Sequence, residues 1–68
     1  MNKDIIKGNW HEAKGKIMQT WSKITNDKVM QMKGSSEELR GLLEKQYGYD
    51  RERAQKEIES FTKKYNFK

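Results

Sequence analysis

Residues 33–50 read KGSSEELRGLLEKQYGYD, and this stretch carries signals for both ends of one helix. Ser35 is the kind of residue that caps a helix start, and Glu38 stands three positions later, where it completes a capping box. Gly48 is placed to end the helix, because glycine readily adopts a left-handed backbone. Between these signals, apolar residues recur at steps of three and four, which predicts a buried face made of Leu39, Leu42, Leu43 and Tyr47.

The sequence after Gly48 predicts a second helix that folds back on the first. Asp50 is placed to cap its start. Its apolar residues again fall on one narrow stripe, namely Ala54, Ile58, Phe61 and Tyr65. The short turn around Tyr49 joins the two helices into a helical hairpin.

The N-terminal half predicts a similar pair. A helix is expected from Trp10 to Ile24, with Asn9 and Glu12 as its capping box. Thr25-Asn26-Asp27 is a natural break, and a short helix is expected over about residues 28–33, ended by Gly34. Residues 4–6 are expected to form a preceding turn or to pack across the end of the core. The stripe of the first helix covers a sector of about 60° and consists of Trp10, Ala13, Ile17, Trp21 and Ile24.

A weak internal repeat supports this division into two halves. Residues 7–15 align with residues 33–41 at an offset of 26, with matching Lys-Gly pairs, cap residues and capping-box glutamates. No segment alternates with period two, and the chain has no proline. We therefore expect an all-α fold over residues 1–68, a single domain of four short helices arranged as two packed helical hairpins.

The charge of the chain is biased toward its first half. The whole chain carries fifteen Lys and Arg against ten Asp and Glu, a net charge of +5. Residues 1–33 contain seven bases and three acids, so +4 of that excess lies there. Such a bias can attract nucleic acid or an anionic membrane surface, or it can be a solvated lysine-rich surface, which we favour. With no cysteine, no apolar stretch that could span a membrane and no secretory signal, we expect a cytoplasmic protein.

The residues for catalysis are largely missing. His11 is the only histidine, and position 15 is glycine, so the metalloprotease pattern His-Glu-x-x-His fails. Without cysteine or a second histidine we expect no metal site, no cofactor and no nucleophilic triad. The sequence therefore predicts that the protein is not an enzyme.

Two glycines and three lysines form the candidate interaction surface. Gly15 and Gly41 lie inside predicted helices, where each costs about 1 kcal/mol relative to alanine. They indicate either a structural cause, which we favour, or a surface that a partner approaches closely. The structural cause is tight packing between the two hairpins or simple inheritance from the internal repeat. The lysines lie within the predicted helix that carries Trp10 and Trp21. Aromatic residues interleaved with basic ones can stack on single-stranded nucleic acid. We favour a core role for both tryptophans, because the chain has few other large apolar groups. The lysines are Lys14, Lys16 and Lys23.

Taken together, these motifs resemble the CsbD-like bacterial stress-response family. The resemblance rests on the opening Met1–Asp4, Gly8-Asn9-Trp10, Lys14-Gly15-Lys16, Trp21, Lys23-Ile24-Thr25, Gly34, Gly41-Leu42 and Tyr47-Gly48-Tyr49. It implies a small protein of general stress responses without an agreed molecular activity, and a SAM-domain-like arrangement of its two hairpins. No catalytic or binding residues carry over from it. We expect a protein-interaction or protective module with an unidentified protein partner, and the alternative is weak nucleic-acid binding through the basic N-terminal half.

Overall fold

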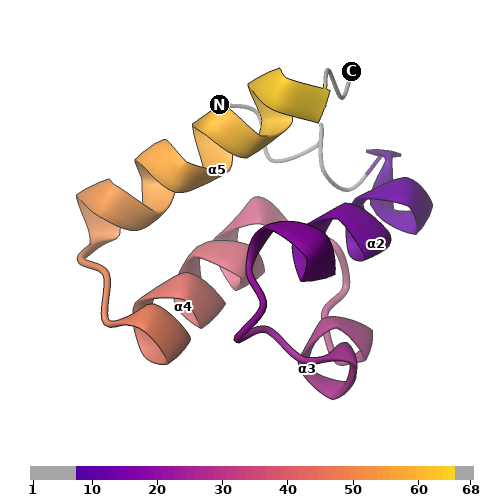
Figure 1. The fold of residues 1–68 in the computed structure, drawn as a ribbon, viewed down its shortest axis with the longest axis horizontal. Helices are drawn as coiled ribbons and strands as arrows, with labels where there is room; N and C mark the ends of the chain where they lie inside the picture. The colour runs from indigo at the N-terminus through magenta and orange to yellow at the C-terminus, as the bar shows by residue number, and fades with distance from the viewer. Residues whose placement is uncertain (1–7, 66–68) are drawn as a thin grey trace.

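The structure, a computed structural model, describes residues 8–65 and places four helices within them (Figure 1). Helix α2 packs against α3, and the longer α4 and α5 lie antiparallel as a second hairpin (Figure 1). The predicted all-helical fold of paired helices is thereby confirmed, while the SAM-domain-like arrangement stays a prediction. The expected turn at residues 4–6 lies outside the described residues. The four helices are α2 (Trp10–Thr20), α3 (Asn26–Met30), α4 (Ser36–Tyr47) and α5 (Arg51–Tyr65).

Helix α4 begins and ends at the residues that the sequence predicts. The Ser35 hydroxyl accepts a hydrogen bond from the Glu38 N–H at 3.2 Å, and the Glu38 carboxylate accepts one from the Ser35 N–H at 3.0 Å. The same carboxylate also accepts from the Lys33 N–H, at 2.9 and 3.0 Å to its two oxygens. Gly48 ends the helix with φ at 70°. The capping box and the glycine stop are therefore confirmed.

The Glu38 carboxylate makes the stability of the fold depend on pH. Desolvation raises its pKa, but hydrogen bonds from the backbone of Ser35, Lys33 and Gly34 and from the Ser35 hydroxyl outweigh desolvation and hold the pKa below its ordinary value. The folded state thus binds this proton less readily than the unfolded state does. Its stabilising contribution is present above the ordinary glutamate pKa of about 4.3 and disappears as the pH falls through the lowered folded value.

We therefore expect Glu38→Gln to lower the free energy of unfolding by about 1 kcal/mol at neutral pH. The difference from the wild type should shrink toward zero as the pH falls to about 3, because the wild-type carboxyl is then protonated too. Urea titrations followed by circular dichroism at several pH values measure this difference. A difference that stays constant over the whole range would show that the carboxylate charge contributes nothing.

The first helix is shorter than its apolar stripe suggests. It ends at Thr20 and not at Ile24, because Trp21 takes an extended backbone with φ −123° and ψ 93°. The Trp21 N–H still donates to the Ile17 carbonyl at 2.9 Å, and the chain then turns. Trp21 and Ile24 are nevertheless buried, as predicted, since the turn carries them into the core.

The caps in the N-terminal half also differ from prediction. Thr25 caps α3 by accepting from the Lys28 N–H at 3.3 Å, so the helix covers Asn26–Met30 and the expected range of residues 28–33 was wrong. Asn9 makes no side-chain cap bond, and the predicted capping box with Glu12 was wrong. Its backbone, at φ −116° and ψ 26°, is outside the extended region that a side-chain cap needs. Its carbonyl accepts from the N–H groups of residues 12 and 13.

The core is built from both hairpins and from the turns between them. Trp21 and Phe61 meet there with ring centroids 4.9 Å apart, which ties the α2–α3 turn to α5. Gly34 is buried against the ring of Trp10, at φ 100°. The buried apolar residues are Ala13, Ile17, Trp21, Ile24, Val29, Met32, Leu39, Leu43, Ala54, Ile58 and Phe61.

Candidate functional site

The two helix glycines face solvent. Gly15 lies in α2 and Gly41 in α4, each opposite the buried stripe of its helix, and both are exposed. A Cβ atom added at either position would meet no atom within 4 Å. Neither glycine has a positive φ. The predicted tight packing of the two hairpins at these glycines was therefore wrong, and no contact within the described residues requires glycine at either position.

We expect Gly15→Ala and Gly41→Ala each to raise the free energy of unfolding by about 1 kcal/mol, because alanine lowers the entropy cost of helix formation. For a domain of this size each change should raise Tm by about 4–8 °C. Thermal unfolding followed by circular dichroism measures the shift. Gly48→Ala is the control, since its positive φ predicts a lower Tm. A fall in Tm for either helix variant would mean that the position is crowded after all.

The three candidate lysines do not share one environment. Lys14 and Lys16 are half-buried on α2, whereas Lys23 is exposed in the turn that follows it. The Lys16 ammonium lies 5.2 Å from the centroid of the Tyr65 ring, and the Lys23 ammonium lies 5.2 Å from that of Tyr47. Both contacts are of the cation–π type. Two of the three lysines are thus held against tyrosines of the other hairpin.

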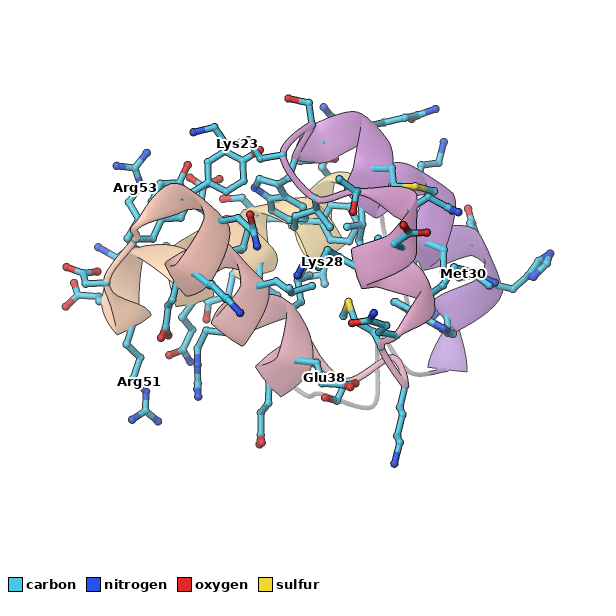
Figure 2. The ribbon with its side chains drawn as sticks, turned by 90° about the horizontal axis from the view of Figure 1, so that it is seen from below. Lys23, Lys28, Met30, Glu38, Arg51 and Arg53 are labelled. Atoms are coloured by element: carbon cyan, nitrogen blue, oxygen red, sulfur yellow. The ribbon has the colours of Figure 1, made fainter. Side chains whose placement is uncertain are left out.

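The Tyr-Gly-Tyr turn has a structural role that sequence reasoning missed. Tyr47 and Tyr49 stack with centroids 5.3 Å apart, and the Arg53 guanidinium lies 4.4 Å above Tyr49. Lys23 covers the Tyr47 ring, and its N–H donates to the Tyr47 hydroxyl at 3.1 Å. Figure 2 shows Lys23 and Arg53 along one edge of the molecule, with Arg51 at the opposite edge. No local signal in the sequence pairs Lys23 with Tyr47, because only the fold brings the two residues together.

The tryptophans serve the core, as favoured from the sequence. Trp21 is 3% exposed, and Trp10 is half-buried against Gly34. Their rings are therefore not an open stacking platform for bases. His11 is exposed on α2.

The described part of the chain was compared with three kinds of site: a small-molecule pocket, a metal site and a membrane span. A hollow of about 270 Å³ beside the start of α5 is lined by two acids and two bases, Asp50, Glu52, Arg53 and Lys56. Residues 8–65 hold no group of three or more His, Cys, Asp or Glu side chains arranged for a metal ion. Among the same residues, no helix has the length and apolar character needed to cross a membrane.

The amino-acid sequence matches a known protein family. The CsbD-like family model matches residues 4–56, most of the chain. The chain belongs to the CsbD-like family. The match spans α2, α3 and α4 together with the Tyr-Gly-Tyr turn and the start of α5, so it includes both glycine-bearing helices of this CsbD-like chain.

Individual CsbD-like relatives match over nearly their full length. The UPF0337 protein YjbJ of Escherichia coli is 37% identical over 68 residues, covering 100% of this chain and 99% of YjbJ. The UPF0337 protein XAC4007 of Xanthomonas axonopodis is 44% identical, covering 93% of this chain and 91% of its own. The UPF0337 protein PA4738 of Pseudomonas aeruginosa is 40% identical, covering 91% and 95%. No solved structure matches the chain.

Proposed function

We propose that this CsbD-like chain is a non-catalytic, cytoplasmic module of the bacterial stress response that binds a protein partner through the outward faces of α2 and α4. The resemblance of the whole chain to a stress-response family supports a role in the bacterial stress response. The small size of the domain and its single histidine support a binding role over a catalytic one.

The exposed glycines carry the proposal. Gly15 and Gly41 weaken their helices, yet an added Cβ at either would meet only open space. Because glycine has no Cβ, another backbone can approach a helix more closely at a glycine than at any other residue. Binding of a partner at these faces gives the two glycines a purpose that the isolated fold does not supply.

Alanine variants separate binding from folding. The tagged wild-type chain and the Gly15→Ala and Gly41→Ala variants would be used to recover proteins from stressed bacteria, and each recovered partner would be purified and titrated. The alanine variants are expected to be more stable but to bind the partner about tenfold more weakly, since a methyl group opens the closest contact. Gln55→Ala, exposed on α5, is the control. Equal affinity of all four proteins for every purified partner would contradict binding through the glycines.

A second candidate function, nucleic-acid binding through the basic half, is favoured by the distribution of ion pairs. The ion pairs found within residues 8–65 all join side chains of α4 or of α5, namely Arg40–Glu44, Arg53–Glu57 and Lys56–Glu52. In that part of the chain, Lys14, Lys16 and Lys23 therefore have no carboxylate partner that would compete with a phosphate.

For this function we expect binding to a mixed-sequence single strand that weakens steeply with salt, because bound lysines release counterions from the phosphates. Replacing Lys14, Lys16 and Lys23 together by glutamine should reduce the slope of log K against log salt by about 2, at about 0.7 per phosphate contact. Fluorescence anisotropy at several salt concentrations measures the slope. A triple variant with the wild-type slope would exclude these lysines as the contact site.

A further inference from the structure

Two ammonium groups from different helices converge on one tyrosine. The Lys16 Nζ, from α2, lies 5.2 Å from the centroid of the Tyr65 ring, and the Lys64 Nζ, from α5, lies 5.4 Å from the same centroid. Neither lysine takes part in an ion pair within residues 8–65. Both ammonium groups thus contact one ring, and neither has a neutralising carboxylate in that range.

Contacts with the core hold the Tyr65 ring in place. The Tyr65 ring packs edge-on against Phe61 at 5.2 Å, and Phe61 in turn packs against buried Trp21 at 4.9 Å. This aromatic chain holds the polar edge of Tyr65 in one place. A site whose groups are positioned before the ligand arrives loses less entropy on binding.

The hydroxyl end of Tyr65 lies in a positive field. A hydrogen bond with the Thr20 side chain lowers the pKa of the Tyr65 hydroxyl, against the opposing effect of desolvation, and the nearby charges of Lys64 and Lys16 lower it further. Two ammonium groups thus lie against the Tyr65 ring, and their charges act on its hydroxyl.

We propose that Lys16 and Lys64, positioned by Tyr65 and Thr20, bind a phosphate group. A phosphate monoester is a dianion near neutral pH, so it balances the two ammonium charges, and its oxygens can accept N–H bonds from both lysines. The Lys64 side chain is exposed and that of Lys16 is half-buried, so a ligand reaches the pair from solvent. This inference does not rest on the proposed protein-binding function, because it concerns Lys16 and Lys64 and neither glycine.

The test follows the Tyr65 ring of the full chain by NMR during titration with inorganic phosphate, against sodium chloride at equal ionic strength. Phosphate is expected to shift the Tyr65 signals with saturation in the millimolar range and to raise the pKa of its hydroxyl, because bound anion cancels the lysine charges. Lys16→Gln and Lys64→Gln should each weaken binding about tenfold. Lys16→Arg should retain it, and Lys45→Gln, exposed on α4, is the control.

Two further ligands identify the source of the phosphate. A short oligothymidylate that binds more tightly than inorganic phosphate, and loses that affinity in both glutamine variants, would assign the site to nucleic-acid phosphates. A sugar phosphate that binds more tightly would assign it to small metabolites. Equal shifts with phosphate and with chloride, or wild-type affinity in both glutamine variants, would overturn the proposal.

Discussion

Replacement of Trp21 by alanine is expected to leave most of the chain unfolded near room temperature. Trp21 is buried, contacts Phe61 at 4.9 Å and ties the α2–α3 turn to α5. Truncating a buried tryptophan typically costs about 3–5 kcal/mol, from lost burial and from the cavity that is left. A single core of this size supplies about 3–5 kcal/mol of stability in total. The loss is therefore comparable to the whole stability of the domain.

The measurement is the helical circular dichroism signal of Trp21→Ala in buffer and in urea. Trp21→Phe is the informative companion, because it keeps an aromatic ring against Phe61 and should remain folded with reduced stability. Met30→Ala is the matched control, since Met30 is 62% exposed and lies on α3 away from the core (Figure 2). A helical, cooperatively unfolding Trp21→Ala protein would mean that the two hairpins are held together by other contacts.

Replacement of Gly34 by alanine is expected to lower the free energy of unfolding by about 2–3 kcal/mol, through two additive causes. Gly34 has φ at 100°, which L-residues rarely adopt. In addition, its Cβ would lie 3.0 Å from Cγ and 3.1 Å from Cδ2 of Trp10, closer than such atoms pack. The indole ring can relieve the second cause only by shifting away from the added methyl group, which disturbs its packing beside the core.

Gly48→Ala separates the two causes. Gly48 also has a positive φ, of 70°, but an added Cβ there meets nothing within 4 Å, so only the backbone cost of about 1–2 kcal/mol applies. Urea titration of both variants measures the difference, and tryptophan fluorescence reports movement of Trp10. In a Trp10→Ala background the extra cost of Gly34→Ala should vanish. Equal costs for Gly34→Ala and Gly48→Ala in the wild-type background would show that Trp10 yields without penalty.

Prediction from the sequence was best where one short segment contains its own signals. The start of α4 at Ser35, its end at Gly48 and the buried stripe of α5 all follow from local hydrogen bonding and helical spacing. The cap of α5 belongs with them, since Asp50 accepts from the Arg53 N–H at 2.7 Å. In these segments the fold and the local preference agree.

The internal repeat misled prediction where it implied equivalence between the halves. It matched Asn9 with Ser35, but only Ser35 caps with its side chain. It also matched Gly8 with Gly34, but Gly8 is exposed and an added Cβ there would meet nothing within 4 Å, whereas Gly34 is packed against Trp10. Similar residues at matched positions of a repeat do not make similar contacts when one position lies at the surface and the other in the core.

In the candidate site too, features that depend on local sequence were predictable and features that depend on distant residues were not. The exposure of Gly15 and Gly41 could be anticipated from their helical positions, but whether another helix covers them depends on how the hairpins dock. The partners of Lys16 and Lys23 could not be foreseen, since Tyr65 lies 49 positions from Lys16 and Tyr47 lies 24 from Lys23. No local signal specifies which residues so far apart will meet.

The sequence by itself therefore determined the helical class, the hairpin pairing and the identity of most core residues, because helical periodicity and capping act within a few residues. Only the tertiary structure decided that Trp21 and Ile24 enter the core from a turn, that Gly34 backs onto Trp10, and that lysines of one hairpin rest on tyrosines of the other. These features depend on how two hairpins, each with its own apolar face, pack into one shared core. That choice minimises exposed apolar surface over the whole chain and is made by contacts between residues distant in sequence.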